Sequence, residues 1–243
     1  MREVRVWLLP RGDLSVEGAA AVVVDQLRAS STIVRALAAG AACVRPCPEP
    51  ADAIALRGEG VVLGGERGGL RIEGFDLGNS PSEYTSGRVA GMAVAFTTTN
   101  GTRAIASAQR AGAERVVIGC LNNLSAVVGS VRSARRVVVV CAGTDGAETE
   151  EDTLVAGAIA DRLIPLGFAP AQDQPTRLAL AAWRSLPAPE DQAGALATAM
   201  RSSRGGKNLA AIGLGADVDD CAAVDSHPVV PALGADGALR CGS

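Results

Sequence analysis

Short apolar runs alternate with helix-like segments along this chain, and this alternation restricts its fold more than any other feature. The apolar runs have strand length and cover residues 4–9, 21–24, 43–47, 61–63, 93–96, 115–119 and 137–141. Helical patterns lie between them at residues 30–39, 102–111, 123–133 and 151–166. Strands that alternate with helices form layered α/β folds. We therefore predict an α/β/α fold with a largely parallel or mixed sheet, in one domain over residues 1–243.

A weak internal repeat relates two parts of the chain. Ala21-Val-Val-Val-Asp25 resembles Ala93-Val-Ala-Phe-Thr97, and an Ala-Gly-Ala triplet recurs at the same offset, at residues 39–41 and 111–113. Each copy predicts a strand, a polar loop, a helix that stops at glycine, and a second strand. The prediction is two similar βα halves, residues 21–47 and 93–119. The alternative is that any two βα units look alike.

Residues 168–208 are less regular, because several prolines interrupt short amphipathic pieces. We expect a helical insertion or lid there. Residues 209–213 and 229–233 are expected to return to the sheet. Because proline cannot donate a ladder hydrogen bond, Pro231 predicts an edge position for the last strand.

Composition limits the classes of partner. The net charge of −3 gives no general attraction for nucleic acid or anionic lipid. No apolar run approaches the ~20 residues that span a bilayer, and the first residues lack a secretory signal pattern. We expect a cytoplasmic protein without a membrane partner. The six cysteines include no CxxC pair, so buried thiols are expected rather than a zinc site or a disulfide framework.

Three polar clusters follow predicted strands and precede predicted helices. They are residues 25–32, which begin with Asp25, residues 97–103, which read TTTNGTR, and residues 142–146. Ligands in open α/β sheets bind outside the carboxyl ends of the strands, and helix N-termini present free N–H groups to anions. A shared anion pocket is predicted at this edge. A plain turn is the alternative for Asn100-Gly101.

The common phosphate-handling motifs do not occur in the sequence. Gly206-Lys207 lacks the first glycine of a Walker loop, and the GGERGG run at residues 64–69 is not the dinucleotide pattern GxGxxG. No GxSxG elbow is present, and a Ser-His-Asp triad could use only His227. The remaining chemistry consists of carboxylates, arginines and hydroxyls.

Carboxylates beside arginines indicate a Mg²⁺ site next to an anion pocket. Mg²⁺ prefers carboxylate and water oxygens and pairs with substrate phosphates, and guanidinium groups bind phosphate or carboxylate through two hydrogen bonds. The run GGERGGLRIEGFDLGNSP, residues 64–81, places acids and arginines among glycines that allow the backbone close to a ligand. Arg71 and Glu73 are expected to be bystanders. Glu151-Asp152 have an alternative role, electrostatic support of a helix N-terminus.

Five longer motifs lie between residues 25 and 146: Asp25-x-Leu-Arg-Ala-Ser-Ser-Thr-Ile-Val, Gly64-Gly-Glu-Arg-Gly-Gly-Leu, Gly74-Phe-Asp-Leu-Gly-Asn-Ser-Pro81, Thr97-Thr-Thr-Asn-Gly-Thr-Arg103 and Cys141-Ala-Gly-Thr-x-Gly. Together with Glu151-Asp152 and the tail, they resemble the 2-phosphosulfolactate phosphatases, the ComB family. The resemblance implies a Mg²⁺-dependent hydrolase that converts (2R)-2-phospho-3-sulfolactate to 3-sulfolactate and phosphate, on the route to coenzyme M. Gln26 departs from the pattern, where a small aliphatic residue is expected.

The resemblance and the residue chemistry together define the expected site. The candidate catalytic residues are Asp25, Glu66, Arg28, Arg67 and Arg103. The candidate substrate contacts are Ser30, Ser31, Asn79, Thr98, Thr99, Asn100 and Gly101. The candidate Mg²⁺ ligands are Asp25, Glu66, Glu151 and Asp152.

Several alternatives stay open at this point. The nucleophile is either a metal-positioned water or Asp25 itself. The substrate could be another small phosphorylated hydroxy-acid. A non-catalytic anion-binding module is the third possibility, and a homodimer is a reasonable expectation.

Overall fold

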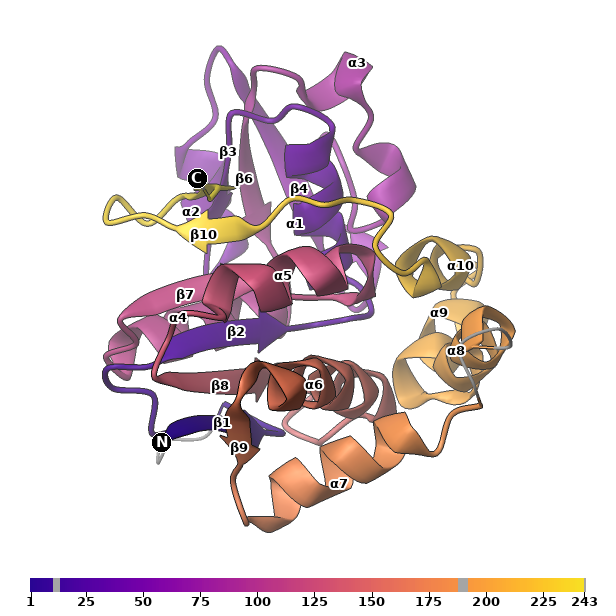
Figure 1. Ribbon diagram of the computed structural model, residues 1–243. Coiled ribbons are helices and arrows are strands. Elements are labelled where there is room, and N and C mark those ends of the chain that lie inside the picture. Colours follow the sequence, from indigo (N-terminus) through magenta and orange to yellow (C-terminus); the bar gives the residue numbers. More distant parts are fainter. Residues whose placement is uncertain (11–13, 188–191, 243) are drawn as a thin grey trace.

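The computed structural model describes residues 1–10, 14–187 and 192–242 (Figure 1). The strands are β1 (Arg2–Trp7), β2 (Ala20–Val24), β3 (Cys43–Pro46), β4 (Val61–Arg67), β5 (Leu70–Arg71), β6 (Ala93–Thr97), β7 (Arg115–Ile118), β8 (Arg136–Cys141), β9 (Phe168–Pro170), β10 (Pro231–Leu233) and β11 (Leu239–Cys241). The helices are α1 (Ala29–Ala38), α2 (Pro50–Ala55), α3 (Ser86–Val89), α4 (Gly101–Arg110), α5 (Leu124–Val131), α6 (Glu150–Leu163), α7 (Gln174–Arg184), α8 (Gln192–Ser202), α9 (Arg204–Ala211) and α10 (Asp217–Ala222). Short 3₁₀ turns are η1 (Pro81–Glu83), η2 (Leu121–Asn123) and η3 (Ile164–Leu166).

The strands of the described residues form one mixed sheet in the order β5-β4-β6-β3-β11-β10-β7-β2-β8-β1-β9. The pairs β1–β8, β2–β8, β2–β7, β3–β6, β4–β6 and β1–β9 are parallel, whereas β5, β10 and β11 pair in antiparallel fashion. The largely parallel sheet and the α/β class predicted from the alternating pattern are confirmed.

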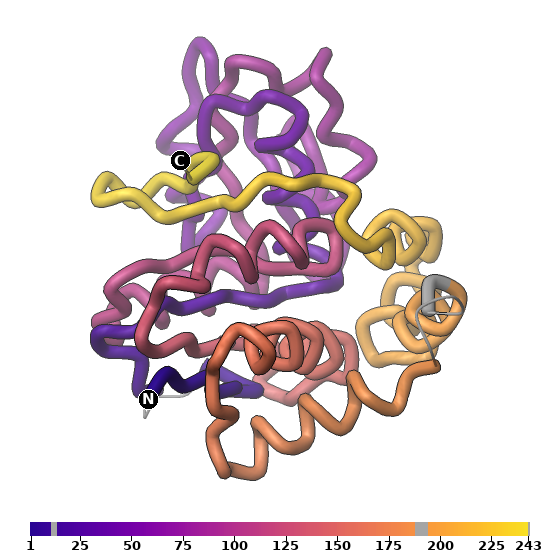
Figure 2. The backbone as a smooth tube through the Cα atoms, viewed as in Figure 1, coloured from indigo at the N-terminus to yellow at the C-terminus, as the bar shows by residue number. Residues whose placement is uncertain are grey.

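The C-terminal hairpin of β10 and β11 lies inside the sheet. It joins β3 on one side to β7 on the other, and Figure 2 shows this segment passing between two groups of strands. The edge position predicted from Pro231 is therefore wrong. Pro231 is tolerated because it is the first residue of β10, and the register with β7 runs through Ala232 and Val117 instead.

The expectation that residues 209–213 form a strand is also wrong. Residues 209–211 complete α9, where Leu209 is buried and Ala210 and Ala211 are exposed. This one-sided burial suits a helix packed against other helices, here α6, α8 and α10, rather than an alternating strand.

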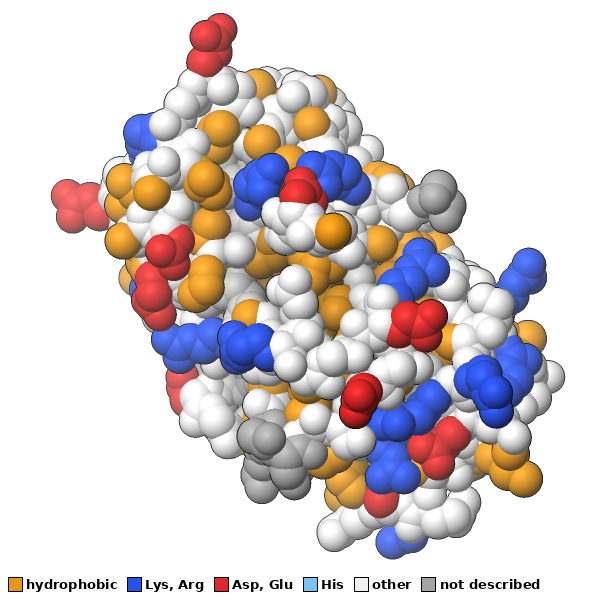
Figure 3. Space-filling view, turned by 90° about the vertical axis from the view of Figure 1, so that its left-hand side faces the viewer, with side chains coloured by type: hydrophobic (Ala, Val, Ile, Leu, Met, Phe, Trp, Pro, Cys, Tyr) orange, Lys and Arg blue, Asp and Glu red, His pale blue; other side chains and the backbone are white. Residues whose placement is uncertain are grey.

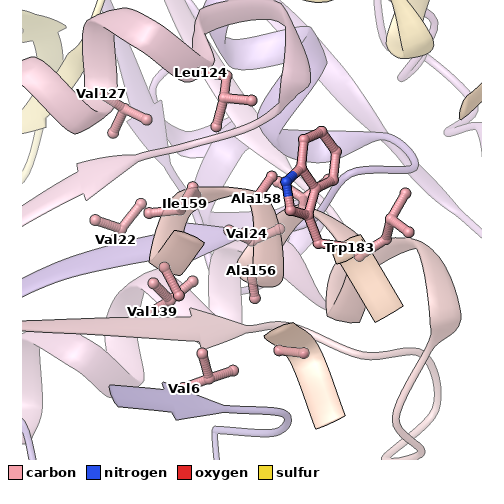
Figure 4. Packing of buried hydrophobic residues seen from close by; sticks show 14 of the residues in the cluster. Val6, Val22, Val24, Leu124, Val127, Val139, Ala156, Ala158, Ile159 and Trp183 are labelled. Atoms are coloured by element: carbon pink, nitrogen blue, oxygen red, sulfur yellow. The ribbon is translucent and has the colours of Figure 1, made fainter. Parts of the chain in front are cut away.

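Both faces of β2 are covered by helices. Val22 and Val24 point into one apolar cluster with residues of α5, α6 and α7 (Figure 4). Ala21 and Val23 point into a second cluster that contains residues of α1 and α4. Successive strand side chains face opposite sides of a sheet, so burial of both sets requires helices on both faces. This is the predicted α/β/α layering.

The two predicted βα halves pair crosswise in the sheet. The first contributes β2, α1 and β3, and the second contributes β6, α4 and β7. β2 pairs with β7, and β3 pairs with β6. A common origin of the halves stays a prediction.

The region expected to be a helical insertion begins with β9, which pairs with β1 at the sheet edge, and continues through α7, α8 and the start of α9. Residues 188–191 of this region lie outside the described residues. A lid function stays a prediction. Five of the six cysteines are buried as expected, but Cys241 is exposed at the end of β11.

Figure 3 views the face at which β1, β2 and β8 begin, and there arginine and acidic side chains are interspersed. None of the described helices combines the length and the apolar character needed to cross a membrane. The opposite edge of the sheet, where these strands end, carries the polar clusters.

Candidate active site

A polar cavity of about 390 Å³ lies at the carboxyl ends of the strands. Figure 1 shows α8, α9 and α10 beyond these strand ends, and α9 supplies one wall of the cavity. The lining residues are Asp25, Leu27, Arg28, Glu66, Gly68, Gly69, Asn79, Thr99, Asn100, Thr144, Asp145, Gly205, Asn208, Leu209, Ala211 and Ile212. The structure therefore brings together the three polar clusters identified in the sequence.

Asp25 follows the last residue of β2 and is held in place by the start of α1. Its backbone N–H donates to Ser30 Oγ at 2.9 Å, and its Oδ1 accepts from the N–H of Ala29 at 3.2 Å. A Cβ at Gly101 would lie 2.7 Å from Asp25 Oδ2 and 2.6 Å from Ala29 Cβ. The beginnings of α1 and α4 thus meet at this carboxylate, and only glycine fits at position 101.

The environment of Asp25 disfavours its charged form. Burial, together with the negative charges of Glu66 and Glu151, raises the pKa of Asp25 from 3.8 to about 7. A hydrogen bond from Ala29 and the charge of Arg28 act in the opposite direction. A shift of this kind, at a carboxylate lining a cavity, is typical of functional sites.

Glu66 ties two loops together at the cavity wall. It lies on β4, directly after the Gly64-Gly65 pair. Its Oε1 accepts from the N–H of Thr99 at 2.7 Å, and its Oε2 accepts from the N–H of Gly69 at 2.7 Å and from Thr99 Oγ1 at 3.3 Å. Both carboxylate oxygens are engaged, so Glu66 shapes the cavity.

The glycines before Glu66 allow tight packing of β4. A Cβ at Gly65 would lie 1.9 Å from the carbonyl oxygen of Thr97, and a Cβ at Gly64 would lie 2.2 Å from Tyr84 Oη. The charged glycine run of the sequence is thus partly a strand interior, where close backbone approach requires glycine.

Asp152 is buried near the start of α6 and organises backbone around Asp25. Its Oδ1 accepts from the N–H of Gln26 at 2.8 Å, and its Oδ2 accepts from the N–H of Gly143 at 3.0 Å. Burial and the charges of Asp25 and Glu151 raise the pKa of Asp152 well above its usual value. Asp152 therefore does more than support a helix N-terminus, because it links the loop after β8 to the one after β2.

Glu151 is buried beside the same group. A Cβ at Gly205, on α9, would lie 2.3 Å from Glu151 Oε1. Glu151 Oε2 is buried without a hydrogen-bond partner among the described residues. Burial raises the pKa of Glu151, and the neighbouring charge of Glu150 acts in the same direction.

Arg28 is the arginine that lines the cavity, but its charge is already paired. Its Nη1 donates to Asp217 Oδ2 at 2.5 Å and to Ser80 Oγ at 3.1 Å, and its Nη2 donates to the carbonyl oxygen of Gly69 at 2.7 Å. Both side chains of the ion pair are almost fully buried. Arg28 therefore anchors α10 to the site as well as facing the cavity.

Arg67 and Arg103 do not line this cavity. Arg67 Nη2 donates to Thr97 Oγ1 at 3.0 Å and lies 3.6 Å from a carboxylate oxygen of Glu49. Arg103 is exposed and pairs with Glu49 at 3.3 Å, beside a separate hollow that it lines together with Asn100. Their predicted contact with substrate stays a prediction.

The predicted hydroxyl and amide contacts divide into two groups. Asn79, Thr99 and Asn100 line the cavity. The other predicted contacts do not line it. Ser30 and Gly101 lie against Asp25, as described above. Thr98 Oγ1 accepts from the N–H of Thr102 at 3.3 Å, and Ser31 donates to the carbonyl oxygen of Gln26 at 3.2 Å.

Sequence reasoning missed the contribution of α9 and α10. Asn208 and Leu209 line the cavity from α9, and Asp217 neutralises Arg28 from α10. Gln26, noted as a departure, is fully buried; its Oε1 accepts from the N–H of Leu121 at 2.9 Å and its Nε2 donates to the carbonyl oxygen of Cys221 at 2.8 Å. No local pattern marks these long-range partners.

Comparison with known proteins identifies the family of the chain. The family model described as 2-phosphosulpholactate phosphatase matches residues 9–236. A protein of Deinococcus radiodurans is 42% identical over 229 residues, covering 90% of this chain and 92% of that protein. A protein of Thermotoga maritima is 38% identical over 218 residues, covering 90% of each chain.

A third relative, from Thermotoga petrophila, is 46% identical over 148 residues, which cover 61% of this chain and 64% of that protein. All three relatives carry the name "Probable 2-phosphosulfolactate phosphatase". With the family model matching nearly the whole chain, this protein belongs to the 2-phosphosulfolactate phosphatase family.

Proposed function

We propose that this protein is a Mg²⁺-dependent phosphatase that hydrolyses (2R)-2-phospho-3-sulfolactate to 3-sulfolactate and phosphate, the step expected on the route to coenzyme M. Family membership and the names of the relatives support the substrate. The cavity at the carboxyl ends of the strands supports the reaction class, because it combines a carboxylate of raised pKa with polar groups suited to a small anion.

One observation carries the metal requirement: the charge balance of the cavity. Its ionisable lining residues are Asp25, Glu66, Asp145 and Arg28. Arg28 is already paired with Asp217, and Asp145 is paired with Arg204, so Asp25 and Glu66 are the lining acids without an ion-pair partner among the described residues. A substrate with phosphate, sulfonate and carboxylate groups would therefore meet net negative charge, and a divalent cation would reverse this repulsion.

The residues present suit Mg²⁺ rather than a metal with an all-protein ligand cage. Among the described residues, no three His, Cys, Asp or Glu side chains are grouped to hold a metal ion. Mg²⁺ commonly uses one or two carboxylates, waters and substrate phosphate oxygens. Asp25 Oδ2 lies at the cavity and accepts no hydrogen bond from the described residues, whereas both oxygens of Glu66 and of Asp152 do.

We therefore assign Mg²⁺ to Asp25, with Glu151 as the second candidate ligand because its Oε2 has no hydrogen-bond partner among the described residues. Glu66 and Asp152 fix the surrounding loops. When bound, the cation would neutralise phosphate charge and lower the pKa of coordinated water. The side-chain amides of Asn79, Asn100 and Asn208 can donate to the substrate's acid groups.

Hydrolysis then requires water to add to phosphorus while the bond between phosphorus and the substrate's C2 oxygen breaks. Water is the simpler nucleophile, because the Asp25 carboxylate is assigned to the cation. Direct attack by Asp25 is the rival, and isolation of a phospho-aspartyl adduct at Asp25 would exclude the water route.

The direct test is release of inorganic phosphate from 2-phosphosulfolactate with Mg²⁺, and with a chelator in its place. We expect turnover that depends on the metal. A panel of other phosphorylated hydroxy-acids without a sulfonate measures specificity, and equal rates across the panel would contradict the assigned substrate. Absence of phosphate release from every compound would contradict the phosphatase assignment.

A further inference from the structure

A second polar cavity, of about 400 Å³, lies beside α1 and shares no lining residue with the candidate active site. Its wall includes Arg35 from α1, Ser82 from η1, Asp219 and Asp220 from α10, and His227. His227 is the single histidine of the chain and has no role in the proposed reaction.

The positive charge of Arg35 in this cavity has no carboxylate partner. Arg35 is partly buried, and its side chain makes one hydrogen bond to the described residues, from Nη1 to His227 Nε2 at 3.3 Å. Its Nε is buried and unpartnered among them. A guanidinium carries five N–H donors, and a partly desolvated charge without a counter-ion is unfavourable.

His227 does not supply the missing negative charge. A guanidinium can only donate, so Nε2 must accept and the ring is neutral in this contact. Burial lowers the pKa of His227, and the charge of Arg35 acts in the same direction, whereas a backbone hydrogen bond and the charge of Asp220 act against them.

The acids of the cavity wall form no ion pair with Arg35. Asp219 is exposed and paired with Arg201. Asp220 is exposed, and its carboxylate is not within ion-pair distance of Arg35 or of any other described cation. Ser82 is exposed and its hydroxyl makes no hydrogen bond to the described residues, so a neutral donor is free in the wall of the same cavity.

We propose that this cavity is a binding site for a small oxyanion of the phosphate type, held by the guanidinium of Arg35 and the hydroxyl of Ser82. The volume admits such an ion with its water, and the site is independent of the metal and of the proposed substrate. Charge-assisted hydrogen bonds from arginine to an oxyanion are stronger than those between neutral groups. The anion supplies the direct ion-pair partner that Arg35 lacks among the described residues.

The test is calorimetric titration of inorganic phosphate into the full chain in the presence of EDTA, at constant ionic strength. We expect one phosphate per chain. The variant Arg35→Gln should bind at least about tenfold more weakly, and Ser82→Ala a few-fold more weakly. Arg184→Gln, which removes an exposed arginine paired with Asp161, is the matched control and should bind like the wild type.

Three results would overturn the proposal. They are no phosphate binding by the wild type, unchanged binding by Arg35→Gln, and chloride that binds the site as tightly as phosphate does. Loss of binding in Asn208→Ala, which removes a donor from the lining of the candidate active site, with retention in Arg35→Gln would place the anion in the active site instead. If circular dichroism shows that Arg35→Gln does not fold, Ser82→Ala becomes the deciding variant. Ser82 is exposed, so its replacement should leave the fold intact. Unchanged affinity in that variant would then refute the site.

Discussion

Replacing Asp25 by asparagine should make the metal-free protein more stable at alkaline pH. In the folded protein, burial and neighbouring carboxylates raise the pKa of Asp25 from 3.8 to about 7. Between these two values the folded state holds a proton that the unfolded state has lost. The free energy of unfolding therefore falls as pH rises through this range, and the loss is complete above about pH 7.

The size of the effect follows from the shift. A displacement of about three pKa units corresponds to about 4 kcal/mol at about 1.4 kcal/mol per unit. Asp25 lines the cavity and is only partly buried, so solvent screening reduces this figure to roughly 2–4 kcal/mol. For a chain of this size, the melting temperature of Asp25→Asn should rise by roughly 5–15 °C. Asparagine keeps an oxygen that can accept from Ala29.

The assay is urea and thermal unfolding of both proteins in EDTA at pH 4 and pH 8. The stability difference should be large at pH 8 and nearly absent at pH 4. Glu59→Gln, at an exposed acid in a loop, is the control and should show no such difference. Added Mg²⁺ should stabilise the wild type and leave Asp25→Asn unchanged. An Asp25→Asn variant that is less stable than the wild type at pH 8 would refute the charge-repulsion argument.

Three further changes test the site. Asp217→Asn leaves the guanidinium of Arg28 buried without its carboxylate, and should lower the free energy of unfolding by about 3–5 kcal/mol in urea titration; a loss below about 1 kcal/mol would contradict the buried pair. Gly101→Ala introduces a Cβ at 2.7 Å from Asp25 Oδ2, and should reduce kcat at least about tenfold in the phosphate-release assay, whereas Gly129→Ala, in open space, should have wild-type kcat. Glu66→Gln places a side-chain amide N–H against a backbone N–H that now donates to Glu66. The variant should lose about 1–3 kcal/mol of unfolding free energy and should also release phosphate more slowly. Near-normal stability together with near-normal phosphate release would remove Glu66 from the site.

The sequence predicted the elements well because their signals are local. Apolar runs of strand length are buried on both faces of the sheet, as at Val22 and Val23. Such runs are required in any α/β fold, whatever the order of its strands. The same reasoning failed for Pro231, since proline excludes a ladder donor only at its own position. It also failed for residues 209–211, a short apolar stretch that fits a strand or a helix equally well.

The sequence by itself determined that Asp25, Asn79, Thr99 and Asn100 would meet, because parallel strands end at one edge and the segments that follow them share it. The tertiary structure decided which charges are available there. Arg28 finds Asp217, 189 positions later, while Arg67 and Arg103 turn to Glu49. Periodicity is set by neighbouring residues, but an ion pair depends on which distant segments the fold brings within a few ångströms. Only the folded chain therefore decides the charge of the cavity.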